Sequence, residues 1–174
     1  RIIEGKRPRF ALLENVDRLL KSPRSQRGRD FAVMLASLSD LGYTVEWRVV
    51  DSSDYGFPQR RKRVFILAER TDGWERTTDW IESDGVMARA LPIHPVEGVR
   101  SFSLGDGELS EISEAFNSDE GDTPTPFGNC GVMVGREVLT AKCKPDFAGE
   151  KATLASVLQT PGKVPDPYIL EPES

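Results

Sequence analysis

The chain has few of the residues that build cross-linked or metal-bound folds. It contains only 2 cysteines and 1 histidine among 174 residues. These are too few for a disulfide framework or for a zinc site with four Cys or His ligands. We therefore expect Cys130 and Cys143 to be small, reduced residues of a cytoplasmic protein.

Long apolar runs are missing as well, and so is a Met at position 1. No apolar stretch approaches the length of a membrane span, and no signal peptide is recognised. We therefore expect no membrane partner. Because residue 1 is Arg, we also expect the chain to be a fragment.

Positive charge is scarce in the second part of the chain. Residues 1–70 contain 15 Lys and Arg against 9 Asp and Glu, whereas residues 71–174 contain 8 against 19. Such asymmetry favours a polyanionic partner for the first part. The alternative is that the net charge reports only solubility.

Hydrophobic patterns in the first part predict an α/β unit. Residues 10–13 form an apolar run typical of a buried strand, residues 30–41 have helical spacing, and residues 44–50 alternate as a strand does. Five apolar residues at 64–68 predict a strand buried on both faces. A strand–helix–strand unit normally makes a parallel crossover, and the short loop before residue 64 then requires an antiparallel return.

The remaining residues show a weaker pattern. Residues 71–127 are acidic and without a clear period, so we expect them to be irregular, with His94 in a loop. Residues 128–144 resemble a β-hairpin, and residues 152–158 are long enough for one or two helical turns. The Pro-rich end, residues 164–174, is expected to be extended.

Charged residues converge on one predicted edge of the sheet. Glu14 follows the strand at 10–13 and lies at the carboxyl edge, where open α/β sheets bind ligands. The antiparallel strand begins at the same edge, where Gln59, Arg61 and Arg63 share a face. We expect a guanidinium to reach the Glu14 carboxylate across roughly two strand spacings, about 10 Å, or to share an open cleft with it. Such a pair suits a planar polar ring, and a purely structural ion pair is the alternative.

Two motifs at this edge resemble those of a known family. Glu-Asn-Val at 14–16 follows an apolar strand, and Gln-x-Arg-x-Arg at 59–63 precedes another. In this order and at about this spacing they resemble the cytosine-C5 DNA methyltransferases. "YGFPQRRKRVFILAER", residues 55–70, is similar to the family pattern almost throughout. Residues 124–170 resemble, to a lesser degree, the region that starts the target recognition domain of bacterial members.

The resemblance implies a fold and a domain organisation. The expected fold class is α/β, with a partial Rossmann-like methyltransferase sheet that includes an antiparallel strand. An irregular, mostly β recognition region follows it. Residues 1–70 would belong to the catalytic domain, and residues 71–174 would start the target recognition domain.

The resemblance also implies roles for the motif residues. Glu14 would act as a neutral acid on N3 of a flipped cytosine, which requires a pKa raised by burial. Arg63 would contact the cytosine O2, and Arg61 would orient Glu14 or bind a backbone phosphate. The other motif residues are expected to support the loop backbone (Asn15 and Gln59) or to contact the DNA substrate (Arg60 and Lys62).

In the complete enzyme, a methyl group of S-adenosylmethionine would pass to C5 of cytosine in double-stranded DNA. Such an enzyme would belong to a bacterial restriction-modification system and act in the cytoplasm, at the nucleoid. The family nucleophile is a Cys in a Pro-Cys segment upstream of Glu-Asn-Val, and the family's cofactor loop is Gly-rich. Neither precedes Glu14 here, and neither Cys130 nor Cys143 has the Pro-Cys context.

We therefore expect a central part of the enzyme that is inactive alone and is completed by missing segments or a second subunit. One alternative is a non-catalytic DNA-binding or interaction module derived from this lobe. Another is an unrelated α/β domain in which the Glu–Arg pair is structural. A Pro-Cys segment in the adjacent coding sequence, or in a partner subunit, would favour the enzyme.

The first prediction concerns the isolated chain. It should neither bind S-adenosylmethionine measurably nor transfer a methyl group to DNA, because it lacks the Gly-rich loop and the nucleophile segment. Calorimetry with the cofactor and a tritiated-methyl transfer assay on the purified chain provide the test. Transfer above background would show that the motifs have been misinterpreted.

Overall fold

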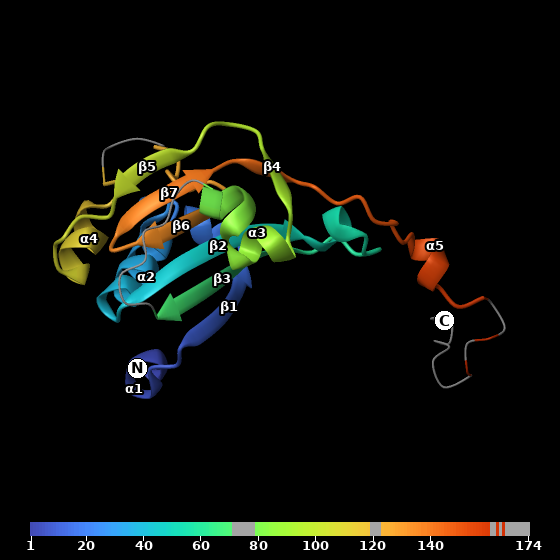
Figure 1. Ribbon diagram of the computed structural model, residues 1–174, viewed down its shortest axis with the longest axis horizontal. Helices are drawn as coiled ribbons and strands as arrows, with labels where there is room; N and C mark the ends of the chain where they lie inside the picture. The colour runs from blue at the N-terminus through green and yellow to red at the C-terminus, as the bar shows by residue number, and fades with distance from the viewer. Residues whose placement is uncertain (71–78, 119–122, 161–162, 164, 166–174) are drawn as a thin grey trace, which may run out of the picture.

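The central element of the described chain is a six-stranded sheet. The computed structural model describes residues 1–70, 79–118, 123–160, 163 and 165. The strand order is β1-β3-β2-β6-β7-β5, and β4 and β8 form a separate two-stranded ribbon (Figure 1). In chain order the elements are α1 (Ile2–Lys6), β1 (Phe10–Val16), η1 (Asp17–Lys21), α2 (Arg29–Asp40), β2 (Tyr43–Asp51), η2 (Ser52–Tyr55), β3 (Lys62–Arg70), η3 (Trp80–Asp84), α3 (Val86–Ala90), β4 (Ile93–Pro95), β5 (Arg100–Ser103), α4 (Leu109–Ala115), β6 (Cys130–Val134), β7 (Glu137–Ala141), β8 (Cys143–Pro145) and α5 (Leu154–Val157).

Strand β3 lies between β1 and β2 and runs antiparallel to both. β1 and β2 are therefore parallel to each other, and α2 connects them. The predicted parallel unit and its antiparallel return are both confirmed. α2 ends where the sequence indicated, with Gly42 in the left-handed region at φ 81° and its N–H bonded to the carbonyl of Ser39.

The sheet continues into the second part of the chain. β2 pairs antiparallel with β6, and β6, β7 and β5 follow in that order. The sheet thus contains strands from both sides of residue 70, and the division into two domains there stays a prediction. The hairpin expected within residues 128–144 is confirmed as β6 and β7, and the short helix within 152–158 as α5.

The stretch expected to be irregular is more regular than its sequence indicated. Within residues 79–118 lie η3, α3, α4 and strands β4 and β5, and His94 lies in β4 rather than in a loop. These elements are only three to seven residues long. Such lengths give no clear period, and contacts with other segments hold these elements: η3 and α3 contact the sheet, α4 contacts α2, and β4 pairs with β8. The Pro-rich end lies mostly outside the described residues.

One face of the sheet packs against α2. The Phe31 ring of α2 makes edge-on contacts with Trp47 of β2, at 5.3 Å between centroids, and with Phe127, at 4.8 Å. Gly131 of β6 lies directly under Trp47, since a Cβ at this position would be 2.2 Å from the indole ring. The closely packed aromatic group joins α2, β2 and β6 into one core.

Two expectations about burial are wrong. In β1, which was expected to be buried, Phe10 and Leu12 are 49% and 65% exposed. β1 is at the edge of the sheet, and no described element covers its side chains on that face. In β3, Val64 and Ile66 are buried but Phe65 is only half-buried, so this strand is closed on one face and partly open on the other.

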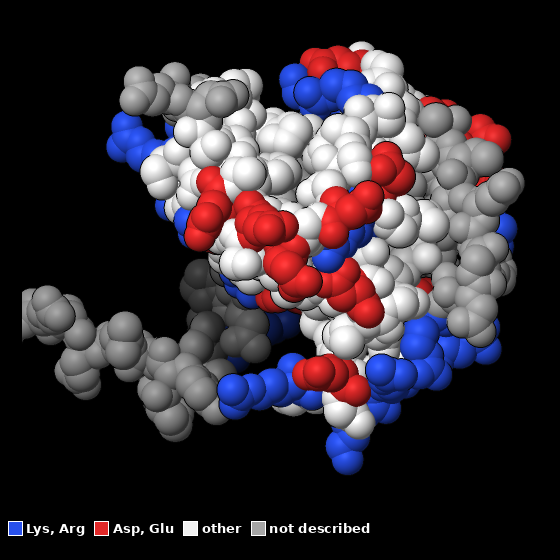
Figure 2. Space-filling model, turned by 90° about the vertical axis from the view of Figure 1, so that its left-hand side faces the viewer, with Lys and Arg blue, Asp and Glu red and all other residues white. Residues whose placement is uncertain are grey.

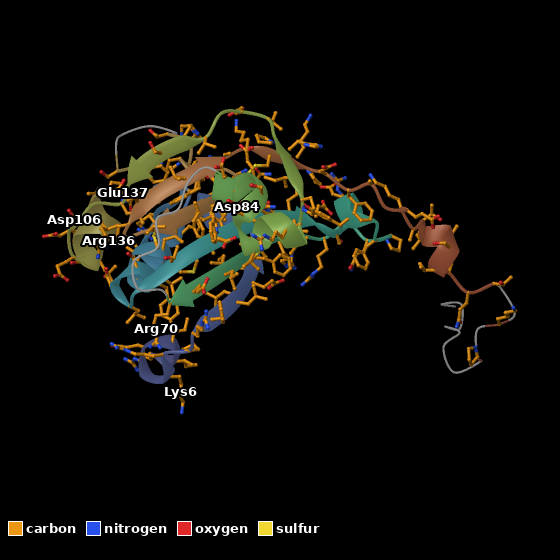
Figure 3. The ribbon with its side chains drawn as sticks, in the orientation of Figure 1. Lys6, Arg70, Asp84, Asp106, Arg136 and Glu137 are labelled. Atoms are coloured by element: carbon orange, nitrogen blue, oxygen red, sulfur yellow. A yellow bond between two sulfur atoms is a disulfide. The ribbon has the colours of Figure 1, made fainter. Side chains whose placement is uncertain are left out.

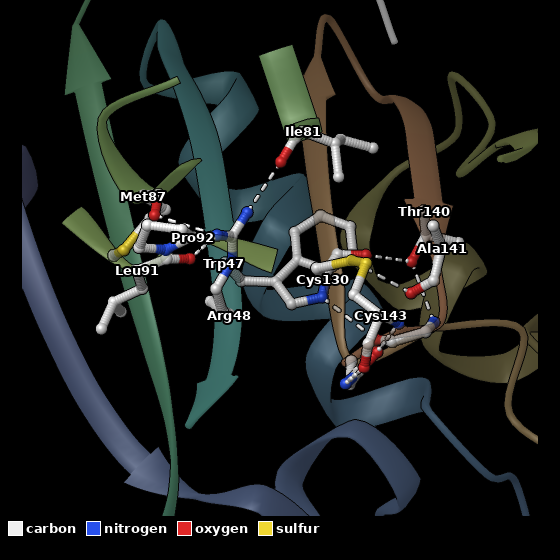
Figure 4. The surroundings of a disulfide bond; sticks show 12 residues. Trp47, Arg48, Ile81, Met87, Leu91, Pro92, Cys130, Thr140, Ala141 and Cys143 are labelled. Carbon is white, nitrogen blue, oxygen red and sulfur yellow. Dashed lines mark hydrogen bonds between the residues drawn. A yellow bond between two sulfur atoms is a disulfide. The ribbon is translucent and has the colours of Figure 1, made fainter. Parts of the chain in front are cut away.

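The second face of β2 is polar and yet buried. Arg48 is 2% exposed and donates hydrogen bonds to the carbonyls of Ile81 (2.8 Å), Met87 (3.0 Å) and Leu91 (Figure 4). Burial lowers the pKa of Arg48, while Tyr55 and Glu46 act in the opposite direction. The guanidinium thus fixes η3 and α3 over this face.

Glu46, two residues before Arg48 on β2, also binds the segment that contains η3 and α3. Its carboxylate is 5% exposed and accepts hydrogen bonds from the Trp80 indole N–H at 2.6 Å and from the Met87 backbone N–H at 3.0 Å. A strand with alternating apolar and polar residues would ordinarily have a wet face. Here the polar face is covered because its two charged residues bind the backbone of the covering segment.

The expectation of two reduced thiols is wrong. Cys130 and Cys143 form a disulfide, with their Cα atoms 6.6 Å apart (Figure 4). The hairpin explains the pairing, because Cys130 lies opposite Ala141 in the β6–β7 register and Cys143 follows two residues later. Neither cysteine is a free thiol.

We predict that Arg48→Met will destabilise the protein by about 3 kcal/mol, because it leaves buried carbonyls without donors. Arg89→Met is a matched control in α3, since Arg89 is exposed and should change stability little. Denaturant unfolding of both variants provides the measurement. Equal effects of the two substitutions would contradict the role given to Arg48.

Candidate functional site

An open cleft of about 440 Å³ lies on the face of the sheet that η3 and α3 cover only in part. Its floor includes Glu14 of β1 and Arg63 and Phe65 of β3, and Met87 of α3 contributes to one wall. Tyr55, at the end of η2, borders the cleft as well. The cleft thus lies at the carboxyl ends of β1 and β2, where the sequence predicted a site.

The two arginines of the second motif both reach Glu14. Arg63 Nε lies 2.9 Å from Glu14 Oε1, and Arg61 Nη2 lies 3.5 Å from the same oxygen. The predicted contact is confirmed, whereas the catalytic roles stay predictions. The expected gap of two strand spacings is wrong, because β1 and β3 are direct neighbours with Val16 opposite Arg63.

The site is accessible to water in this chain. Glu14 is 44% exposed, Arg61 51% and Arg63 23%. The burial expected for Glu14 is therefore not provided by the described residues.

The turn that places the arginines is organised by Asp51, which the sequence analysis missed. Its carboxylate is 6% exposed and accepts hydrogen bonds from the backbone N–H and hydroxyl of Ser53 and from the backbone N–H of Arg61. Burial acts to raise the pKa of Asp51, but these hydrogen bonds and Lys62 outweigh it, so the pKa is lowered. The Asp-Ser-Ser sequence after a strand is a helix-capping signal that could have indicated this role.

The other motif residues surround the pair without touching Glu14. Asn15 accepts a hydrogen bond from the Val16 N–H at 2.8 Å, and the Gln59 backbone carbonyl accepts one from the Ser52 hydroxyl at 2.5 Å. Arg60 is 88% exposed and lies 3.8 Å from Asp51. Lys62 is exposed and borders a different hollow from the one that contains Glu14.

Three basic residues of the hairpin region, Arg136, Lys142 and Lys144, differ in their surroundings. Arg136 is neither exposed nor unpaired: its side chain is 11% exposed, and its guanidinium lies 2.6 Å from Asp40. Lys142 pairs with Glu97 at 2.8 Å. Lys144 is exposed, as a solvated residue would be.

The described residues were not found to contain a metal site, a membrane-spanning helix or a free cysteine. Among them, no group of three or more His, Cys, Asp or Glu side chains could hold a metal ion. In the same part of the chain, no helix has both the length and the apolar character needed to cross a membrane. The disulfide removes both cysteines as candidate nucleophiles.

Comparison with known proteins explains the two motifs around the cleft. The family described as C-5 cytosine-specific DNA methylase matches residues 1–104. The chain belongs to this family. Both Glu14 and the arginines of the cleft lie within the matched range of the DNA methylase family.

Relatives of the chain include several bacterial enzymes. Type II methyltransferase M.Sau3AI of Staphylococcus aureus is 38% identical over 169 residues, which cover 92% of this chain and 39% of that protein. M.BsuFI of Bacillus subtilis is 42% identical over 140 residues, or 80% of this chain and 33% of that protein. M.NlaIV of Neisseria lactamica is 35% identical over 99 residues, or 53% and 23%. The chain therefore spans less than half the length of each of these relatives.

We predict that Asp51→Ala in the complete enzyme will cost about 1 kcal/mol of stability at neutral pH, as the loss of a cap does. The lowered pKa of Asp51 means that the wild-type carboxylate stabilises the fold above its unfolded pKa and loses this effect as the pH falls through its folded pKa. The difference between wild type and variant should therefore shrink in acid.

Thermal unfolding over a pH series measures this difference. Asp54→Ala is the control, since Asp54 is an exposed neighbour in the same turn. The role of Asp51 would be refuted by a destabilisation that persists unchanged at a pH where the carboxyl is protonated.

Proposed function

We propose that the chain is the central part of a DNA (cytosine-5-)-methyltransferase, which transfers a methyl group from S-adenosylmethionine to C5 of cytosine in double-stranded DNA. The observation that carries the proposal is the contact of Arg63 and Arg61 with the Glu14 carboxylate in an open cleft. Membership of the C-5 cytosine-specific DNA methylase family supports it. The chain alone would be inactive, as predicted from its motifs.

In this proposal the cleft holds a cytosine that has been flipped out of the duplex. Nucleophilic attack on ring C6 places electron density on the ring, so a proton at N3 lowers the barrier. Glu14 supplies that proton in its neutral form. Arg63, the less exposed of the two arginines, donates to the cytosine O2, and Arg61 orients the Glu14 carboxyl or holds a phosphate.

β1 and β2 are parallel, and α2 lies between them in the sequence. A Rossmann-like sheet is built from such strand–helix–strand units. We assign residues 1–70 to the catalytic domain and residues 71–174 to the start of the target recognition domain. β1 would then be an edge only in this chain, since the rest of the catalytic sheet would continue beyond it.

S-adenosylmethionine does not fit the residues that the structure describes. A nucleotide-type cofactor is usually held by a Gly-rich turn between a strand and a helix. β1 ends with Glu14-Asn15-Val16, and the 3₁₀ helix η1 follows it directly, without a Gly-rich turn. We assign no described residue to the cofactor and derive no step through it.

The partners follow from the reaction. The substrate would be double-stranded DNA, and the missing segments or a second subunit would supply the nucleophile and the cofactor loop. The relatives are named as Type II methyltransferases, so we assign the enzyme to a bacterial restriction-modification system that acts on DNA in the cytoplasm, at the nucleoid.

The test is Glu14→Gln in the complete enzyme. The amide keeps the shape of the side chain but is a poor proton donor, so the maximal rate of methyl transfer should fall about 100-fold or more. DNA binding should change by much less. Single-turnover transfer of tritiated methyl groups and fluorescence anisotropy measure the two quantities.

Glu137→Gln is the matched control, because Glu137 is exposed and lies at the start of β7. It should transfer methyl groups at the wild-type rate. If Glu14→Gln did so as well, Glu14 would not be the acid. A complete wild-type enzyme that binds DNA without methylating it would favour the non-catalytic module.

A further inference from the structure

A second group of cations follows β1 at the same edge of the sheet as the Glu14 cleft. Residues 17–28 connect β1 to α2. They contain four Lys and Arg and a single Asp. Arg18, Lys21 and Arg24 of this stretch are exposed, and we call these three residues the basic loop.

The basic loop has no internal partners that would explain its charge. Among the described residues, no hydrogen bond or ion pair involves the side chains of Arg18, Lys21 or Arg24. Other cations nearby are paired: Arg29 lies 2.9 Å from Asp30, and Arg63 lies 2.9 Å from Glu14. The charges of the basic loop are therefore available to a ligand from outside the described chain.

The backbone under these cations is fixed by contacts with α4 and its surroundings. The Gln26 amide donates to the carbonyls of Ser113, Glu114 and Phe116, at 3.1 to 3.3 Å. The Thr125 hydroxyl donates to the Leu20 carbonyl at 2.5 Å. A binding surface whose backbone is already ordered loses less entropy when a ligand binds.

The basic loop is close enough to Glu14 for one DNA duplex to contact both. The distance from Glu14 to Lys21 is limited by the chain between them. Strand residues advance by about 3.3 Å each and 3₁₀ residues by about 2 Å each, so two of the first and the η1 segment span at most roughly 17 Å. Phosphates along one DNA strand advance by about 3.4 Å per nucleotide. The distance therefore corresponds to at most about five nucleotides from the target base.

The hollows beside the loop differ in their charge. Lys21 and Lys62 share a hollow of about 260 Å³ with Asp17, Asp51 and Asp54, whose carboxylates make it unsuitable for a phosphate. Lys21 also borders a second hollow, of about 310 Å³, with Arg27, Pro124 and Thr125. Among the described residues that line this second hollow, none carries a carboxylate.

We propose that the basic loop binds the DNA backbone on one flank of the flipped cytosine. The inference rests on the proposed function, because it takes DNA to be the substrate. Flexible Lys and Arg side chains bind phosphate without reading sequence. The basic loop would thus supply affinity and register, while the chemistry stays with Glu14, Arg61 and Arg63.

The opposite end of the strands provides a matched control. Lys6, Arg7 and Arg70 are also exposed. Lys6 and Arg70 lie with α1 at the far end of β1 and β3 (Figure 3). The left-hand side of Figure 1, which faces the viewer in Figure 2, carries a band of acidic side chains and several basic ones.

The experiment uses the complete enzyme with Arg18, Lys21 and Arg24 all changed to Ser, and a second variant with Lys6, Arg7 and Arg70 changed to Ser. Binding of a labelled duplex of random sequence is followed by fluorescence anisotropy over a series of salt concentrations. Each lost phosphate contact reduces the slope of log K against log salt by about 0.9, so the first variant should lose about 2 to 3 in slope. Its affinity at about 0.1 M salt should fall at least tenfold.

At saturating unmethylated DNA the maximal transfer rate of the basic-loop variant should equal that of the wild type, because the catalytic residues are unchanged. The far-end variant should keep the wild-type slope. If the triple substitution prevents folding, the three single substitutions replace it, each with an expected loss of about 0.9 in slope.

A basic-loop variant with the wild-type slope and affinity would overturn the inference and leave the proposed function standing. An equal loss in the far-end variant would also overturn it, since the effect would then reflect net charge alone. A complete wild-type enzyme that neither binds nor methylates DNA would refute both the inference and the proposed function.

Discussion

The antiparallel position of β3 between β1 and β2 is the constraint on which the site depends. A strand that enters the sheet at the carboxyl edge of its neighbours must present its first residues there. Arg61 and Arg63 therefore meet Glu14 although some 47 to 49 residues separate them in the sequence. The buried side chains of Val64 and Ile66 hold β3 in register, so the core sets the position of the charged cluster.

The wall of the cleft depends on a different interaction, the burial of Arg48. Its guanidinium binds three carbonyls of the η3–α3 segment, which has only short helices of its own and would not hold its position without them. Met87 contributes a carbonyl to Arg48 and also lines the cleft. The same strand, β2, thus contributes an apolar face to the core and a polar face to the construction of the site.

Much of the first part could be predicted because its signals are local. The apolar runs, the helical period before Gly42 and the order of the two motifs placed Glu14 and Arg63 at the same edge of the sheet. The sequence could not show which segments cover each face of the sheet, because this cover depends on contacts between segments that are distant in the sequence. The exposure of Leu12, the burial of Arg48 and the Cys130–Cys143 pairing all depend on such contacts. The capping role of Asp51 has a local signal that was missed, whereas its bond with the Arg61 N–H depends on the fold.

The geometry of Glu14 decides what the cleft can hold. Both guanidiniums lie on the same carboxylate oxygen, Oε1, and the Glu14 side chain is 44% exposed. Part of the carboxylate is therefore open to a ligand that enters the cleft. In the proposed function, a flipped cytosine would meet Glu14 at N3 and compete with it for the Arg63 guanidinium at O2. The contacts between Glu14 and the arginines would then position the three side chains in the empty cleft, and the substrate would replace some of these contacts.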